Sequence, residues 1–158
     1  MKSILLDITK CRECKECTVE CEYYYHKNNN GLKFLIEKAI FVTTCRKCED
    51  APCVKVCPKN ALEKKRNGLL KKNNNLCINC KSCVIACPFG TLPLYIFDYL
   101  NSNCDYCSVS EKTTTLKCLQ TCPKNAISLI EEEPKEVNVY KITDKFFVKD
   151  YKWEELIK

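Results

Sequence analysis

The chain has 158 residues, 16 of them cysteine, and a formal net charge of +6 from 26 Lys and Arg against 20 Asp and Glu. So many cysteines indicate a disulfide scaffold, zinc sites or iron–sulfur sites. Disulfides need an oxidising compartment, but residues 1–7 do not resemble a signal peptide. The apolar stretch 92–100 contains Pro93 and Asp98, so no membrane span is expected. We expect a cytoplasmic protein with reduced thiols, built as one compact unit or two small lobes.

The predicted elements alternate with four cysteine groups and indicate the α+β class. Apolar alternation and turn signals predict short strands, and the residues within and after the cysteine groups predict short helices. In the first half of the chain, we expect a strand at 3–8, a helix at 18–26 and one or two strands at 32–43. A hairpin of 60–62 and 69–70 should follow, around a type I′ turn at Asn67-Gly68. In the second half, we expect an exposed loop at 108–117 and strands at 126–130 and 137–142.

The third cysteine group indicates the chemistry most clearly. It reads Cys77-x2-Cys80-x2-Cys83-x3-Cys87-Pro88, the pattern that holds [4Fe–4S] clusters in bacterial ferredoxins. Three cysteines in a short loop can bind three corners of a cubane. The fourth lies about one helical turn further on and binds the neighbouring cluster. We therefore expect a [4Fe–4S] ligand set that crosses between groups.

The same theme occurs four times, which is an internal repeat. The segments Cys57-Pro58-Lys59-Asn60-Ala61 and Cys122-Pro123-Lys124-Asn125-Ala126 are identical. Two repeats make one ferredoxin-like unit with two clusters, so the 16 cysteines predict four [4Fe–4S] clusters in two bacterial-ferredoxin-like units. The groups are Cys11, Cys14, Cys17 and Cys21; Cys45, Cys48, Cys53 and Cys57; Cys77, Cys80, Cys83 and Cys87; and Cys104, Cys107, Cys118 and Cys122.

Two other interpretations remain open at this stage. A zinc-binding interaction module usually combines two separated cysteine pairs, which fits the spacing less well. The positive net charge suggests that the chain binds nucleic acid or an acidic partner. Four oxidised cubanes with their thiolates would add a charge of roughly −8, so the lysines are expected to compensate the charge of the clusters. No nucleic-acid partner is therefore expected. The basic run 64–66 is expected to be a solvated hairpin edge, with steering of an acidic partner as the alternative.

The layout resembles the four-cluster subunits of the molybdenum and tungsten oxidoreductases, and the electron-transfer subunits of formate hydrogenlyase and carbon monoxide dehydrogenase. The residues that carry the resemblance are 45–58, with the sequence CRKCEDAPCVKVCP, and the widened gap between Cys107 and Cys118. The chain also resembles small soluble members, including the polyferredoxin subunit of tungsten aldehyde oxidoreductases. The resemblance implies a non-enzymatic electron-transfer subunit; a standalone polyferredoxin is the alternative.

The resemblance also implies which groups pair: the first with the fourth, and the second with the third. The implied ligand sets are Cys11, Cys14, Cys17 and Cys122; Cys45, Cys48, Cys53 and Cys87; Cys57, Cys77, Cys80 and Cys83; and Cys21, Cys104, Cys107 and Cys118. The expected units are residues 1–30 with 101–142, and residues 31–100.

The implied partner is a catalytic subunit of tungsten aldehyde oxidoreductase, formate dehydrogenase, hydrogenase or carbon monoxide dehydrogenase type, with a second redox subunit or a ferredoxin as a further partner. Residues 143–158 lie outside the repeats and carry Phe146, Phe147, Tyr151 and Trp153. Aromatic residues are common in cores and in interface centres, so this tail is expected to be either core or an arm that docks the partner.

Overall fold

The computed structural model describes residues 2–21, 31–94, 104, 106–107 and 116–151. It divides into two compact units, Met1–Ala39 with Ser102–Lys158 (unit 1) and Ile40–Asn101 (unit 2). Both helices and strands are present, so the chain is of the α+β class. No described helix has the length and apolar character needed to cross a membrane.

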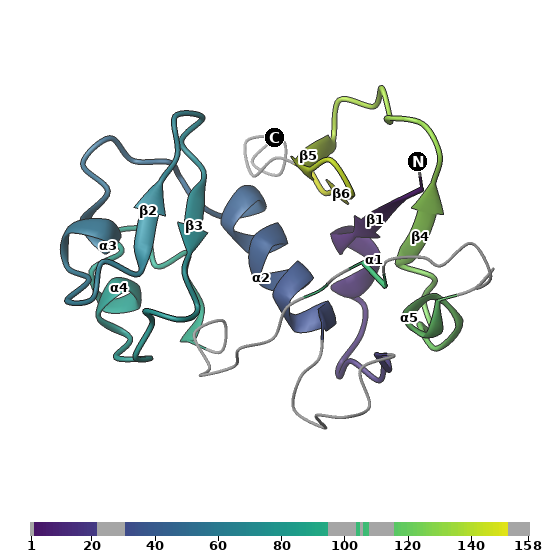
Figure 1. Ribbon diagram of the computed structural model, residues 1–158, viewed down its shortest axis with the longest axis horizontal. Helices are drawn as coiled ribbons and strands as arrows, with labels where there is room; N and C mark the ends of the chain where they lie inside the picture. The colour runs from purple at the N-terminus through teal and green to yellow at the C-terminus, as the bar shows by residue number, and fades with distance from the viewer. Residues whose placement is uncertain (1, 22–30, 95–103, 105, 108–115, 152–158) are drawn as a thin grey trace. The chain divides into compact units, whose positions relative to one another are not determined.

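Unit 1 contains a four-stranded mixed sheet with the order β4-β1-β6-β5 (Figure 1). Strand β1 pairs antiparallel with β4 and parallel with β6, and β6 pairs antiparallel with β5. The predicted strands at both ends of the repeats are therefore confirmed and belong to one sheet. The strands are β1 (Ser3–Asp7), β4 (Ile127–Ile130), β5 (Val139–Thr143) and β6 (Phe146–Lys149).

Strand β6 lies inside this sheet, so residues 146–149 belong to the core, one of the two alternatives expected for the tail. Phe146 and Val148 are fully buried and Phe147 is 4% exposed. Apolar residues at three consecutive positions pack on both faces of the sheet, and β6 gains hydrogen-bonded neighbours on both sides. Of the aromatic residues expected in the tail, Tyr151 is half-exposed, whereas Trp153 lies outside the described residues.

The segment predicted as one or two strands at 32–43 is instead helix α2 (Gly31–Thr43), so that prediction is wrong. Leu32, Leu35 and Ala39 recur at helical spacing and are buried in the core of unit 1. A short apolar run does not distinguish a strand from a buried helix, and here the packing of one helical face decides. The predicted helix at 18–26 is not helical over residues 18–21, and its remainder lies outside the described residues.

Unit 2 contains the hairpin of β2 (Leu62–Lys64) and β3 (Leu70–Lys72) and two short helices, α3 (Pro52–Lys55) and α4 (Ser82–Ile85) (Figure 1). The turn is not type I′, because Gly68 has a positive φ of 78° and Asn67 does not. The Gly68 N–H donates to the Lys65 carbonyl over 2.9 Å and the Lys65 N–H donates to the Leu69 carbonyl over 2.8 Å. This is the longer hairpin loop in which a left-handed glycine follows the turn.

Two further helices of one turn each complete the described elements, α1 (Ile8–Cys11) and α5 (Lys117–Gln120), both in unit 1. Asp7 caps α1, because its carboxylate accepts from the Thr9 N–H over 3.1 Å. The loop expected at 108–117 lies outside the described residues up to residue 115, and α5 begins at Lys117.

Candidate metal centres

The cysteine that ends each of the last three groups is held in the same tight turn. The N–H three residues later donates to its carbonyl: Asn60 to Cys57 over 3.2 Å, Gly90 to Cys87 over 3.1 Å, and Asn125 to Cys122 over 3.1 Å. The donors have φ angles of 49°, 61° and 48°. This left-handed conformation favours Gly and Asn, which explains the residue types at these positions.

These turns also direct polar hydrogens at the cysteine sulfur. The Ala61 N–H donates to Cys57 Sγ over 3.2 Å and the Ala126 N–H donates to Cys122 Sγ over 3.3 Å. In the third turn, Thr91 stands where the other two turns have alanine, and its hydroxyl Oγ1 lies 3.6 Å from Cys87 Sγ. Donors of this kind stabilise a thiolate. The three turns thus direct hydrogen-bond donors at a sulfur that could serve as a metal ligand.

In unit 1, Cys122 lies beside the first cysteine loop. Burial, followed by the charges of Cys122, Cys17 and Cys14 in that order, raises the pKa of Cys11 to about 11. An exposed ion pair also joins the two segments, with Lys124 Nζ 3.0 Å from Glu13 Oε2. The structure therefore brings together Cys11, Cys14, Cys17 and Cys122.

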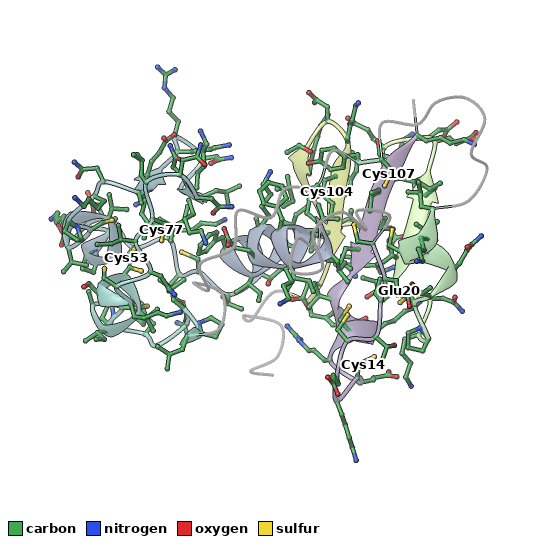
Figure 2. The ribbon with its side chains drawn as sticks, turned by 60° about the horizontal axis from the view of Figure 1, so that its bottom comes forward. Cys14, Glu20, Cys53, Cys77, Cys104 and Cys107 are labelled. Carbon is green, nitrogen blue, oxygen red and sulfur yellow. The ribbon has the colours of Figure 1, made fainter. Side chains whose placement is uncertain are left out.

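The last cysteine of the first group lies instead beside the fourth group. Burial, together with the charges of Cys107, Cys104 and Cys21, raises the pKa of Cys118 to about 12. The preceding residue, Glu20, is fixed against α5: its carboxylate is 2.7 Å from Lys117 Nζ and its N–H donates to Thr121 Oγ1 over 3.0 Å. Figure 2 labels Glu20 together with Cys104 and Cys107 in this unit.

In unit 2, Cys87 lies beside the second group. Burial is the largest cause that raises the pKa of Cys53, and the charges of Cys45 and Cys48 come next. The charge of Cys87 raises this pKa as well, by a smaller amount. Two contacts join the segments: the Arg46 guanidinium lies 5.2 Å from the centre of the Phe89 ring, and Thr44 Oγ1 donates to the Thr91 carbonyl over 3.1 Å. Figure 2 labels Cys53 on the α3 side of the unit.

The fourth set surrounds a pocket in unit 2. Burial, with smaller contributions from the charges of Cys77 and Cys80, raises the pKa of Cys83 to about 11. Cys57 joins them from the other group, and all four cysteines line one hollow that opens to solvent. The hairpin holds the segments together, because the Asn73 N–H donates to the Ala61 carbonyl over 2.7 Å. Cys80 is the exposed member of the set.

The donor chemistry of all four sets fits an iron–sulfur cluster. Thiolates are soft ligands that hold iron–sulfur clusters, zinc and Cu(I). Thiols that share a site repel one another once ionised, and a bound cationic centre offsets this repulsion. Among the described residues, no three Cys, His, Asp or Glu side chains are close enough together to hold a single metal ion.

Lys64 supports the second cysteine loop, a role that the sequence analysis missed. Its Nζ donates to the Cys48 carbonyl over 2.6 Å and to the Lys47 carbonyl over 3.3 Å. The basic run 64–66 is predicted to be a solvated hairpin edge. No feature of the sequence indicates that its first lysine contacts the second cysteine loop. Because Lys47 has a positive φ of 52°, this ammonium group stabilises a strained part of the loop.

Comparison with known proteins agrees with this geometry. Residues 36–132, more than half of the chain, match the 4Fe-4S dicluster domain family. YsaA of Escherichia coli K12 is 30% identical in an alignment 149 residues long, and the match covers 82% of this chain and 90% of the relative. The electron transport protein HydN of Escherichia coli K12 is 28% identical in an alignment 160 residues long, gaps included, and the match covers 84% of this chain and 90% of HydN.

A third relative is part of an enzyme. The iron–sulfur subunit ArrB of the arsenate respiratory reductase of Shewanella sp. ANA-3 is 35% identical over 101 residues, covering 56% of this chain and 43% of ArrB. The four sets of cysteine thiols therefore have the ligand chemistry of an iron–sulfur protein. The chain belongs to the 4Fe-4S dicluster domain family.

Proposed function

We propose that the chain is an electron-transfer subunit that carries four [4Fe–4S] clusters and relays electrons between a catalytic oxidoreductase subunit and a further redox acceptor. The observation that carries this proposal is the crossing of the cysteine groups: the last cysteine of each group lies beside three cysteines of another group. A ferredoxin run crosses in this way when two clusters share one unit.

The proposed ligand sets are two in each unit. In unit 1 they are Cys11, Cys14, Cys17 and Cys122, and Cys21, Cys104, Cys107 and Cys118; in unit 2 they are Cys45, Cys48, Cys53 and Cys87, and Cys57, Cys77, Cys80 and Cys83. A bound cubane supplies one-electron redox chemistry. The chain supplies the thiolates, the N–H donors of the tight turns, and burial that lowers the local dielectric.

The role of one relative supports a catalytic partner. ArrB is named as the iron–sulfur subunit of a reductase, whereas HydN is named only as an electron transport protein. We propose a catalytic subunit of the molybdenum or tungsten oxidoreductase kind, the tungsten aldehyde oxidoreductases included. Affinity purification of the tagged chain under anaerobic conditions should recover such a subunit; recovery of the chain alone would favour a standalone polyferredoxin.

Metal analysis tests the cluster content. Four cubanes predict roughly 16 iron and 16 sulfide per chain, with broad visible absorbance. Cys122→Ser should damage the cluster of the first loop, and Cys21→Ser the cluster of the fourth group, each leaving unit 2 intact. Stoichiometric zinc with little iron would refute the proposal, and roughly eight iron per chain would refute the count.

A further inference from the structure

The formal charge of the chain is concentrated in one unit. Unit 2 contains ten Lys and Arg against four Asp and Glu, whereas the other 16 Lys and Arg fall in unit 1 beside 16 Asp and Glu. Unit 2 therefore carries the whole excess of +6. Two oxidised cubanes in each unit would shift these charges to roughly +2 for unit 2 and roughly −4 for unit 1.

Three of the ten basic residues of unit 2 line the pocket formed by Cys57, Cys77, Cys80 and Cys83. Its walls include Lys59, Lys72 and Lys81, and none of its described lining residues is acidic. Lys81 is held in place, because its Nζ donates to the Leu94 carbonyl over 2.7 Å. We call Lys59, Lys72 and Lys81, together with Ile78, the lysine edge.

The lysine edge also has an apolar centre. Ile78 is 54% exposed, and it lies between Cys77 and Cys80, the latter an exposed ligand candidate. An exposed apolar residue ringed by charge is the pattern of a protein interface, with a desolvated centre and a polar rim. An exposed sulfur at the same place gives a short path for an electron between a cluster in this pocket and a partner.

We propose that the lysine edge is the docking surface for an acidic, low-potential redox protein of the ferredoxin kind, which exchanges electrons with unit 2 beside Cys80. This inference rests on the proposed function and names the second partner of the relay. In the transfer step the partner is oxidised by one electron and the cluster in the pocket is reduced by one electron; no bond forms or breaks. Opposite charges steer such encounters, so the association rate depends on salt.

The test measures the second-order rate constant for reduction of the cluster-loaded full chain by a reduced acidic two-cluster ferredoxin, using stopped flow. For the unmodified chain, the constant should fall at least about tenfold between about 20 mM and about 500 mM NaCl. Lys59→Glu and Lys72→Glu should each lower the low-salt constant about three- to tenfold and flatten the salt dependence.

Two control variants separate the lysine edge from net charge. Lys65→Glu makes the same charge change in unit 2, at the exposed turn of the hairpin, outside the pocket lining. Lys135→Glu makes it at an exposed position of unit 1. Both should change the constant less than about twofold.

Three results would overturn the inference: a rate constant independent of salt, an equal effect of Lys65→Glu and Lys59→Glu, or faster reduction by a basic redox protein than by the acidic one. Iron content and reduction by dithionite are measured on each variant. Full iron with normal dithionite reduction but no salt effect would refute the docking surface alone. Failure to bind iron would refute the proposed function itself.

Discussion

Arg12 and Asp150 join the first cysteine loop to the end of β6, one of the two inner strands of the unit 1 sheet. Arg12 Nη2 lies 2.8 Å from Asp150 Oδ2, and the Asp150 side chain is fully buried whereas that of Arg12 is 49% exposed. The Asp150 N–H donates to the Asn138 carbonyl over 3.0 Å, and its Oδ1 accepts from the Tyr151 N–H over 2.9 Å. A buried carboxylate therefore fixes the loop that holds Cys11 and Cys14.

Arg12→Ala should destabilise unit 1, because it removes the cationic partner of a buried carboxylate. Loss of one charged donor to a buried acceptor costs about 1–3 kcal/mol. In Arg12→Ala, the denaturant concentration at which half of the visible cluster absorbance is lost should be lower than in the unmodified chain. Lys124→Ala removes one partner of an ion pair that is exposed at both ends and should leave the midpoint unchanged. Equal midpoints for both variants would contradict the role assigned to Asp150.

Phe146→Ala should prevent assembly of the unit 1 clusters. The side chain is fully buried in the same core cluster as Cys122, and truncation of a buried phenylalanine costs about 3–5 kcal/mol. We expect iron content to fall to roughly half, because unit 2 keeps its two clusters. Tyr151→Ala, at a half-exposed position just past the strand, should retain full iron content. Full iron in Phe146→Ala would show that β6 is dispensable.

Substitutions at Asn60, in the tight turn after Cys57, should distinguish the effect of backbone strain from the effect of lost side-chain contacts. Asn60→Ala places a residue with little tolerance for the left-handed region at a φ of 49°, which costs about 1–2 kcal/mol. Asn60→Gly reproduces the residue type found at Gly90 and should keep full stability and iron content. The comparison is made by anaerobic denaturation followed through cluster absorbance. A loss with glycine as large as the loss with alanine would refute the conformational explanation.

Thr91 should raise the reduction potential of the proposed cluster at Cys45, Cys48, Cys53 and Cys87. Burial raises the pKa of Cys87, but the Thr91 hydroxyl and N–H lower it, and the net shift is downward. A metal-bound thiolate has no proton to give, so the hydroxyl must donate. Because reduction adds negative charge, this donor stabilises the reduced cluster more.

Thr91→Val keeps the side-chain shape and removes the hydroxyl. We expect a lower potential by a few tens of millivolts, since about 1 kcal/mol corresponds to roughly 40 mV for one electron. Thr91→Ser, which retains a hydroxyl, is the matched control. Redox titration followed by electron paramagnetic resonance identifies the affected cluster. An unchanged potential in Thr91→Val would show that the hydroxyl does not bond to the sulfur.

Removal of iron by a chelator should unfold unit 2 before unit 1. The largest described hydrophobic core cluster consists only of unit 1 residues, from β1, α2, β4 and β6 among other segments. Besides the last turn of α2, unit 2 has a two-stranded hairpin and two helices of four residues each, so metal binding must supply more of its folding energy. Hydrogen exchange should show early loss of protection in β2 and β3 and slower loss in β1. Simultaneous loss in both units would contradict this order.

The local chemistry of the ligands followed from the sequence alone. The spacing of Cys77, Cys80, Cys83 and Cys87 indicates a cubane-binding loop because it is a short-range property of the backbone. The match to the 4Fe-4S dicluster domain family agrees with that interpretation. The left-handed turns at Asn60, Gly90 and Asn125 are likewise local, and their residue types already show the constraint.

Tertiary packing decided the rest. The run 32–43 is compatible with a strand or a helix, and only burial of Leu32, Leu35 and Ala39 on one face makes it a helix. The residues 146–149 are apolar enough for a core or for an interface, and their pairing with β1 decides for the core. The ion pair of Arg12 with Asp150 and the reach of Lys64 to Cys48 join segments far apart in the chain, and no local pattern encodes the partner of a long-range contact.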